Sequence, residues 1–194
     1  MTTRKHESPA GVTRRARGAL RRQELVEAAA AIIREEGPAA VSHRAVAKRV
    51  GCSLSATTYY FTGLDEMLAE AGRINIQMWA RRAEQVADEV ENAPPPSTFR
   101  GVTNAILQAC LPPNEMLSTH YLQLLEAATT APVAHAYADG RARLDDAIER
   151  VLQRIGISVP PALVVAVVDG AAVSALSEGR DVRETAHELL QKIL

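Results

Sequence analysis

The sequence is poor in aromatic side chains and in cysteine. Aromatic residues make up 4% of its 194 residues, and two cysteines, Cys52 and Cys110, are present. Two cysteines do not form the disulfide framework of a small secreted protein, so they suit a reducing compartment. The start of the chain has no apolar segment of the signal-peptide kind. The longest apolar run, residues 162–168, is far shorter than the roughly 20 residues of a membrane span. We therefore expect a cytoplasmic protein that does not enter a membrane.

The sequence also lacks the common catalytic and metal-binding motifs. Its five histidines never occur in an HExxH pattern, and no GxSxG, P-loop or GxGxxG sequence is found. His135 and Asp139 are four residues apart, but two side chains do not make a metal site. We therefore predict that the protein is not an enzyme, with no metal site and no cofactor.

What the sequence contains is alanine, leucine and an uneven charge. Alternating β-branched runs are scarce, which predicts an all-α fold. Residues 1–50 hold 11 Lys and Arg against 5 Asp and Glu, a net +6, whereas residues 51–194 hold 11 against 18, a net −7. A basic N-terminal part is typical of a partner that is a polyanion. Apolar periodicity and Pro or Gly breaks predict about nine helices, over residues 20–36, 42–50, 54–60, 64–91, 98–111, 115–130, 133–155, 161–177 and 182–194.

The segment around residue 50 predicts a helix-turn-helix. Ser42 is a plausible N-cap for the helix over residues 42–50. Gly51 follows where a short helix needs a residue that tolerates the left-handed conformation. Ser53 can cap the next short helix, over residues 54–60. A helix, a Gly-containing turn of three or four residues and a second helix is the arrangement of a DNA-reading helix-turn-helix.

Several short motifs in this region resemble the DNA-binding segment of the TetR family of bacterial transcriptional regulators. The matching features lie within about residues 20–70 and are Glu35-Glu36-Gly37 at the end of the first helix, Val46-Ala47, Gly51-Cys52-Ser53, Tyr59-Tyr60-Phe61 and Asp65-Glu66-Met67-Leu68. The sequence departs from the family at Thr58, where Tyr is frequent, at Ser55, where Gly or Pro is frequent, and at Leu64, where a Lys often touches a DNA phosphate. The module is expected to be intact, with fewer groups for the DNA backbone at Thr58 and Leu64.

Residues of the two short helices are the expected contacts to double-stranded DNA. Arg44 suits a phosphate or a guanine edge, because the guanidinium matches guanine O6 and N7 in a bidentate manner; the alternative is a solvated surface residue. Adjacent tyrosines point about 100° apart on a helix, so one should pack and the other, for preference Tyr60, should offer its hydroxyl to a phosphate. His43 and Lys48 are further phosphate candidates, or plain solvent-exposed residues. The predicted DNA-binding set is Arg44, Ser53, Leu54, Ser55, Ala56, Thr57, Tyr59, Tyr60, His43 and Lys48.

The chain before the first helix is expected to be a flexible basic arm, residues 1–19. It contains five Lys and Arg with Pro and Gly and has little to bury. Such an arm either follows DNA phosphates or enters the minor groove, as the arms of homeodomains do, or it only aids solubility. Residues 20–65 then form the helix-turn-helix domain, and residues 66–194 a helical domain for effector binding and dimerisation.

The helix over residues 161–177 is apolar on nearly all sides, which predicts burial on every side. In a small domain, a second copy of the same helix is a natural cover, so we expect a homodimer built on the last two helices. The predicted interface residues are Val164, Val165, Val168, Ala172, Leu176 and Leu190. Asp169, within this stripe, is expected to be a satisfied interface carboxylate or an acceptor for a hydroxyl.

Most of the larger aromatic, Met and His side chains lie between the long helix and this pair. In proteins similar to this one, helices four to seven enclose a small-molecule pocket, and its filling moves the two DNA-binding modules. Core packing is the alternative for these side chains. The predicted pocket residues are Trp79, Met78, Phe99, Cys110, Met116, His120, Tyr121 and Tyr137.

The expected function is a ligand-responsive, sequence-specific DNA-binding regulator. The resemblance implies a repressor that leaves a pseudo-palindromic operator when a small apolar effector binds. The alternatives are a constitutive helix-turn-helix protein without an effector and a helical protein-interaction module.

Overall fold

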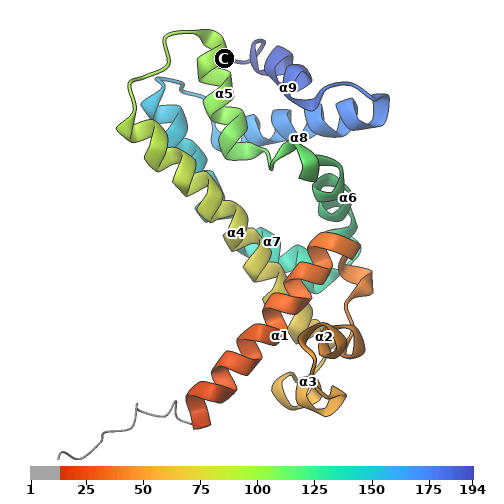
Figure 1. Ribbon diagram of the computed structural model, residues 1–194. Helices are drawn as coiled ribbons and strands as arrows, with labels where there is room; N and C mark the ends of the chain where they lie inside the picture. Colours follow the sequence, from red (N-terminus) through yellow and green to blue (C-terminus); the bar gives the residue numbers. More distant parts are fainter. Residues whose placement is uncertain (1–13) are drawn as a thin grey trace, which may run out of the picture.

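The protein is built from helices, as the computed structural model shows for residues 14–194 (Figure 1). No β-strand occurs within this range, so the all-α prediction is confirmed. The helices are α1 (Arg14–Glu36), α2 (His43–Val50), α3 (Leu54–Tyr60), α4 (Leu64–Asn92), α5 (Phe99–Cys110), α6 (Leu117–Ala127), α7 (Ala131–Arg154), α8 (Pro161–Glu178) and α9 (Val182–Leu190). Two short 3₁₀ helices, Pro38–Ala40 and Asn114–Met116, precede α2 and α6.

The first helix is longer than predicted. It begins at Arg14, so the last six residues of the predicted arm are helical, and residues 1–13 of that arm lie outside the described residues. The segment from Arg14 to Ala19 contains Arg and Ala, which are strong helix formers, and this outweighs the cost of Gly18. Leu20 is 58% exposed because the start of α1 extends beyond the helices that cover its later turns.

The predicted local interactions begin and end the first helix of the helix-turn-helix. The Ser42 hydroxyl accepts from the backbone N–H of Ala45 at 3.1 Å, which satisfies one free donor at the start of α2. Gly51 adopts the left-handed conformation, with φ 71°, and ends α2. Val46 and Phe61 are buried in a core shared with α1 and α4, as their apolar spacing predicts. These contacts hold α2 and α3 against α1 and the start of α4.

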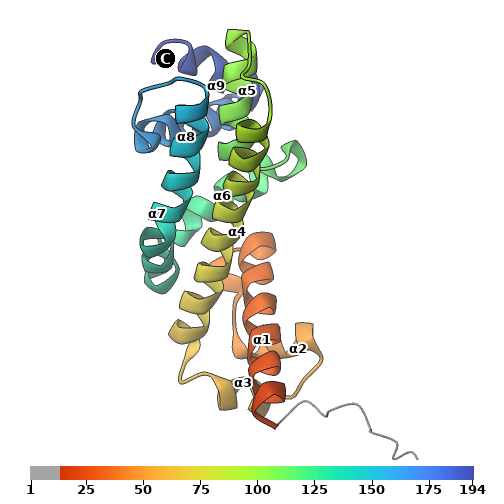
Figure 2. The ribbon, with the colours of Figure 1, turned by 90° about the vertical axis from the view of Figure 1, so that its left-hand side faces the viewer.

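Helix α4 connects this end of the molecule to the other. It lies beside α7 along much of its length, with α5, α8 and α9 gathered at the far end (Figures 1 and 2). The two helices approach closely because Gly140 of α7 faces Ile76 of α4 without a side chain between them. A second core, formed by α4 to α9, surrounds the far half of the helix.

Helix α8 packs one face into this second core and leaves the other uncovered. Val164, Val168, Ala172 and Leu190 have no exposed surface, Val165 is 7% exposed and Leu176 is partly buried against the same core. Side chains without exposed surface cannot touch another copy, so most of the predicted interface set is wrong. A helix that is apolar all round does not reveal which face its own chain covers.

The uncovered face of α8 carries other residues. Leu163 is 47% and Val173 39% exposed, and Ala166, Gly170 and Ser177 lie at helical spacing with them. Of the described helices, α8 alone is long and apolar enough to cross a membrane by length and composition, with 33% of it buried. Its inner face packs into the second core, and the uninterrupted apolar run of residues 162–168 is only part of this helix.

Candidate functional site

Helix α3, predicted to read DNA, lies at the end of the molecule with part of its surface exposed. Figure 1 shows α3 and the start of α1 at the end opposite α5, α8 and α9. Ser53, Leu54 and Ser55 are exposed and Ala56 is partly exposed, so the first turns of α3 are not covered by the rest of the chain. Arg44 and Lys48 of α2 are exposed as well.

Two predictions within this segment are wrong. Thr57 has no exposed surface, because its side chain faces the core and its hydroxyl donates to the Leu54 carbonyl at 2.8 Å. It therefore cannot present its methyl group to a base. Ser53 occupies the N-cap position of α3 without capping it, since its hydroxyl pairs with that of Ser55 at 2.9 Å instead.

The side chains of Tyr59 and Tyr60 point in different directions, as those of adjacent residues in a helix do. Tyr59 is 79% exposed, whereas Tyr60 is partly buried and packs against the core of α1 and α4. Their rings meet edge to face at 5.0 Å, and the Tyr60 hydroxyl lies close to Gly18 of α1. One tyrosine packs, as predicted, but the preference for Tyr60 as the free hydroxyl is reversed by its contact with α1.

A basic groove joins α3 to the first turns of α1. Its lining residues include Arg15, Arg17, Arg21 and Tyr59. Arg15 and Arg17, predicted to lie in a flexible arm, are helical residues of α1 and line this groove. His43, a predicted phosphate contact, is half-buried, and its Nδ1 atom is buried without a hydrogen-bond partner.

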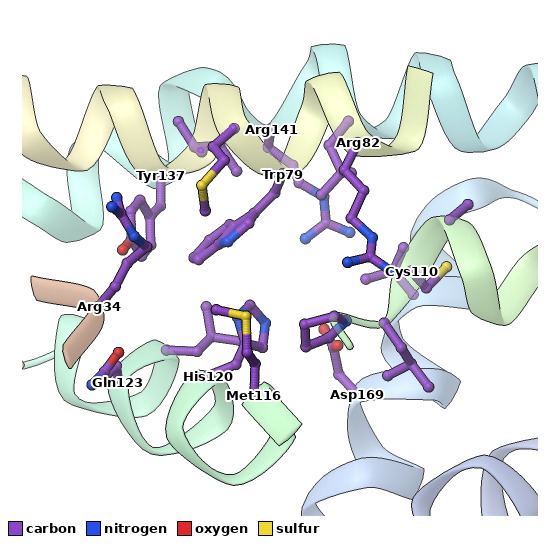
Figure 3. A pocket seen from close by; sticks show the side chains of 18 of the residues that line it. Arg34, Trp79, Arg82, Cys110, Met116, His120, Gln123, Tyr137, Arg141 and Asp169 are labelled. Atoms are coloured by element: carbon purple, nitrogen blue, oxygen red, sulfur yellow. The ribbon is translucent and has the colours of Figure 1, made fainter. Parts of the chain in front are cut away.

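A cavity of about 420 Å³ lies between the end of α1 and the helices α4 to α8 (Figure 3). Ligand pockets in proteins commonly have volumes of roughly 300–1,000 Å³. Of the predicted pocket residues, six line it: Met78, Trp79, Cys110, Met116, His120 and Tyr137. Side chains from α1, α4, α5, α6, α7 and α8 contribute to its wall, so the cavity is built by elements that are distant in the sequence.

The two other predicted residues lie outside the cavity wall. Phe99 is 38% exposed and its ring packs on His187 of α9 at 5.6 Å. Tyr121 lies behind the wall, where its hydroxyl donates to the Asp169 carboxylate at 2.9 Å. Asp169 therefore accepts from a hydroxyl, as one of its two predicted roles required, but it faces the cavity and not an interface between copies.

The charged and amide side chains of the cavity wall were not predicted from the sequence. Arg34, Arg82, Arg141 and Gln123 line it together with Asp169. No signal in the sequence marks these residues, because an Arg or Gln in an amphipathic helix normally faces solvent. Only their position between packed helices makes them part of a cavity.

Burial shifts several pKa values around the cavity. Burial, and next the positive charge of Arg82, lowers the pKa of His120 to about 4, so its ring is neutral near pH 7. Burial, and next the charge of Asp169, raises the pKa of the Cys110 thiol to about 12. Burial also raises the pKa of Asp169, against the opposing hydrogen bond from Tyr121.

Replacing His120 by Gln should reduce the loss of stability on acidification. The unfolded chain protonates this ring below its ordinary pKa of about 6.5, whereas the folded protein resists protonation down to about pH 4. The folded state is therefore penalised progressively as the pH falls through this window, by roughly 2 kcal/mol at about pH 4.5. Urea unfolding of both proteins at about pH 7 and about pH 4.5 measures the difference. The exposed His135→Gln variant is the matched control, and an equal acid sensitivity of H120Q and the parent would contradict the prediction.

The described residues offer no site for a metal ion. Within residues 14–194, no group of three or more His, Cys, Asp or Glu side chains is placed to hold one. The arrangement combines an exposed helix, α3, with a partly open cavity, and α4 runs between the two.

Comparison with known protein families gives two matches along the chain. A family described as "Bacterial regulatory proteins, tetR family" matches residues 25–71, which contain α2 and α3. A family described as "Tetracyclin repressor-like, C-terminal domain" matches residues 94–194, more than half of the chain. A comparison with curated proteins gives no match.

Solved structures share the whole fold. A transcriptional regulator from Rhodococcus sp. Rha1 is 27% identical with a TM-score of 0.65, over 89% of this chain and 95% of that one. The multidrug binding protein EbrR in complex with ethidium is 26% identical with a TM-score of 0.57, over 90% and 98%. A putative transcriptional regulator from Saccharomonospora viridis in complex with choline is 19% identical with a TM-score of 0.65, over 90% and 96%. The last likeness concerns the fold alone.

Proposed function

Because the chain belongs to the TetR family of bacterial transcriptional regulators, we propose that it is a cytoplasmic, ligand-responsive repressor. In this proposal a homodimer binds a pseudo-palindromic operator through α3 and leaves it when a small molecule fills the cavity. The observation that carries the proposal is that one helix, α4, ends beside the reading module and lines the cavity with Ile76, Met78, Trp79 and Arg82. No catalytic step is assigned to the protein.

The DNA-side end of α4 is tied to α1. Arg22 of α1 donates to Glu66 at 2.9 Å and to Glu70 at 3.4 Å, and its guanidinium lies 5.0 Å from the centre of the Phe61 ring. Glu66 also accepts from the backbone N–H of Thr62 at 2.8 Å, at the turn that leads out of α3. A displacement of α4 is therefore transmitted to both α1 and α3.

The cavity-side connection between the same helices passes through Asn75. This side chain is fully buried in α4, accepts from Arg34 of α1 at 2.5 Å and donates to the Ala30 carbonyl at 3.3 Å. Arg34 is itself part of the cavity wall. A ligand that engages Arg34 changes the contact between α1 and α4, which is the differential interaction that a population shift between DNA-binding and released states requires.

The related structures support a small-molecule effector. EbrR was solved with ethidium, and the Saccharomonospora viridis protein with choline. A constitutive helix-turn-helix protein would have no use for a cavity of about 420 Å³ lined by charged and aromatic side chains. A purely protein-interacting helical module would have no use for an exposed α3 beside a basic groove.

The uncovered face of α8 is the proposed dimer surface, in place of the buried residues named from the sequence. Replacing Val173, 39% exposed on that face, by Arg should convert a dimer into a monomer, because each interface would hold two unpaired charges. Sedimentation at micromolar concentration measures the change. Leu20→Arg is the matched control, since Leu20 is 58% exposed at the DNA end of the molecule. A parent protein that sediments as a monomer would refute the dimer.

Selection of bound DNA from random duplexes tests the proposed function as a whole. The expected result is an enriched pseudo-palindrome whose half-sites lie about 10 base pairs apart, or a multiple of that spacing. Bound duplex is then challenged with small molecules, and its release demonstrates an effector. Indifference to every duplex at moderate ionic strength would refute DNA-dependent regulation, and an operator that no cavity ligand releases would favour the constitutive alternative.

A further inference from the structure

The cavity wall carries more positive than negative charge. Arg34, Arg82 and Arg141 line it, and Asp169 is the one acid among its lining residues. The Arg141 Nε donates to Asp145 at 2.6 Å, so this guanidinium already has a carboxylate partner. Arg34 is engaged by a buried asparagine of α4. The third arginine differs from both.

Arg82 extends from α4 into the cavity, and the Nε atom of its guanidinium has no hydrogen-bond partner (Figure 3). This atom is buried, and among the ion pairs of residues 14–194 none includes Arg82. Burial, and next the positive charge of Arg183, lowers the pKa of Arg82, and only Glu115 acts in the opposite direction. A partly buried cation without a counter-charge is costly, so the site favours an anion.

A second positive side chain lies near the same edge of the cavity. Arg183 of α9 donates to the Asn114 side chain at 2.6 Å and to the Pro112 carbonyl at 3.1 Å. Pro112 is part of the cavity wall, so Arg183 sits just outside it. Like charges this close together attract an incoming anion before it reaches Arg82.

The middle of the cavity is lined by aromatic rings and a Met side chain. The Trp79 ring packs edge to face on Tyr137 at 5.0 Å and on His120 at 4.9 Å, and Figure 3 shows Met116 across the cavity from Trp79. His120 is neutral near pH 7, which keeps this part of the wall uncharged. Aromatic faces and a Met side chain suit a planar ring system.

We propose that the cavity binds a flat, largely apolar organic acid, with its anionic group on the Arg82 guanidinium and its rings beside Trp79. This inference rests on the proposed function, in which the cavity is the effector site. An Arg paired with a carboxylate gives short, charge-assisted hydrogen bonds, and here the Arg82 Nε offers a donor that has no other partner.

An organic cation is the competing occupant, because aromatic rings and Asp169 attract one. Three arginines in the same wall oppose it. Asp169 is also a weaker attraction than its presence suggests, since burial raises its pKa and Tyr121 already occupies one of its oxygens. The acid is therefore favoured over the cation in this chain, although related structures hold cationic ligands.

Three probes with one ring system test the charge preference: naphthoate, the neutral naphthamide and the cationic naphthylmethylammonium. Trp79 is the single tryptophan of the sequence and lines the cavity, so quenching of its fluorescence reports binding there. Naphthoate should bind at least about tenfold more tightly than the other two. Arg82→Gln should reduce naphthoate affinity to that of naphthamide, whereas Arg81→Gln, at the exposed neighbouring position, should not.

The possible results bear differently on this inference and on the proposed function. Tighter binding of the ammonium probe, or of ethidium, than of naphthoate overturns the inference and leaves an effector site in place. The same holds if R82Q, with a thermal melt like that of the parent, binds naphthoate as the parent does. Binding of naphthoate without release of operator DNA supports the inference and overturns the regulatory role. If no probe of any charge binds to a protein that still binds its operator, both the effector site and the inference are refuted.

Discussion

Replacing Arg44 by Ala should weaken operator binding by roughly 10–100-fold at one fixed salt concentration, the range expected when a well-placed Arg contact to a guanine edge is lost. Arg44 is exposed in the first turn of α2. Because it is exposed, its removal leaves the fold unchanged. Fluorescence anisotropy with the selected duplex, repeated across salt concentrations, measures the effect.

The salt dependence distinguishes the two possible roles of Arg44. A phosphate contact would weaken binding to all duplexes and reduce the salt slope by about 1, whereas a base contact would relax the preference at one position. The tyrosines supply a matched pair of hydroxyl deletions: Tyr59→Phe should cost several-fold in affinity and Tyr60→Phe little, because Tyr59 is 79% exposed and Tyr60 packs against the core. R44A with the parent's affinity and slope would exclude Arg44 from the interface.

Replacing Gly140 by Ala should destabilise the protein by about 1–3 kcal/mol, although alanine is the better helix former. A Cβ atom at Gly140 would lie 2.5 Å from Cγ2 and 2.9 Å from Cγ1 of Ile76, so α4 and α7 would have to move apart. These branches are fixed close to the α4 backbone and cannot rotate away together. Urea unfolding at neutral pH measures the change in the free energy of unfolding.

Two further variants make this result specific. Gly18→Ala is the matched control, because its new Cβ would meet only the Tyr60 ring edge at ordinary distances of 3.9 and 4.0 Å, and it should leave stability unchanged or slightly higher. Ile76→Ala removes both clashing carbons, so its cost and that of G140A should combine to less than their sum by about 1 kcal/mol or more. Additive effects would show that the close approach of α4 and α7 is not the cause. Since Ile76 also lines the cavity, G140A should change ligand affinity as well.

The sequence alone predicted the helix-turn-helix and the helix boundaries well because those depend on local chemistry. Ser42 caps α2 and Gly51 ends it through interactions within a few residues, and the Pro residues after α4 and α5 stop helices wherever the chain is folded. Six of the eight predicted cavity residues line the cavity, because large adaptable side chains between packed helices tend to surround such spaces. The extension of α1 to Arg14 was missed because an Arg-rich segment without an apolar face has no periodicity to detect.

The sequence by itself determined the fold class, the position of the reading helix and the regulatory family that its motifs resemble. The tertiary structure alone decided which side of each helix meets the rest of the chain. It turned Thr57 inward and Tyr59 outward, buried the valines predicted for the interface between copies, and enclosed Arg34, Arg82 and Asp169 around one cavity. The physical reason is that capping and periodicity act over a few residues, whereas the direction in which a side chain is buried depends on helices that are distant in the sequence.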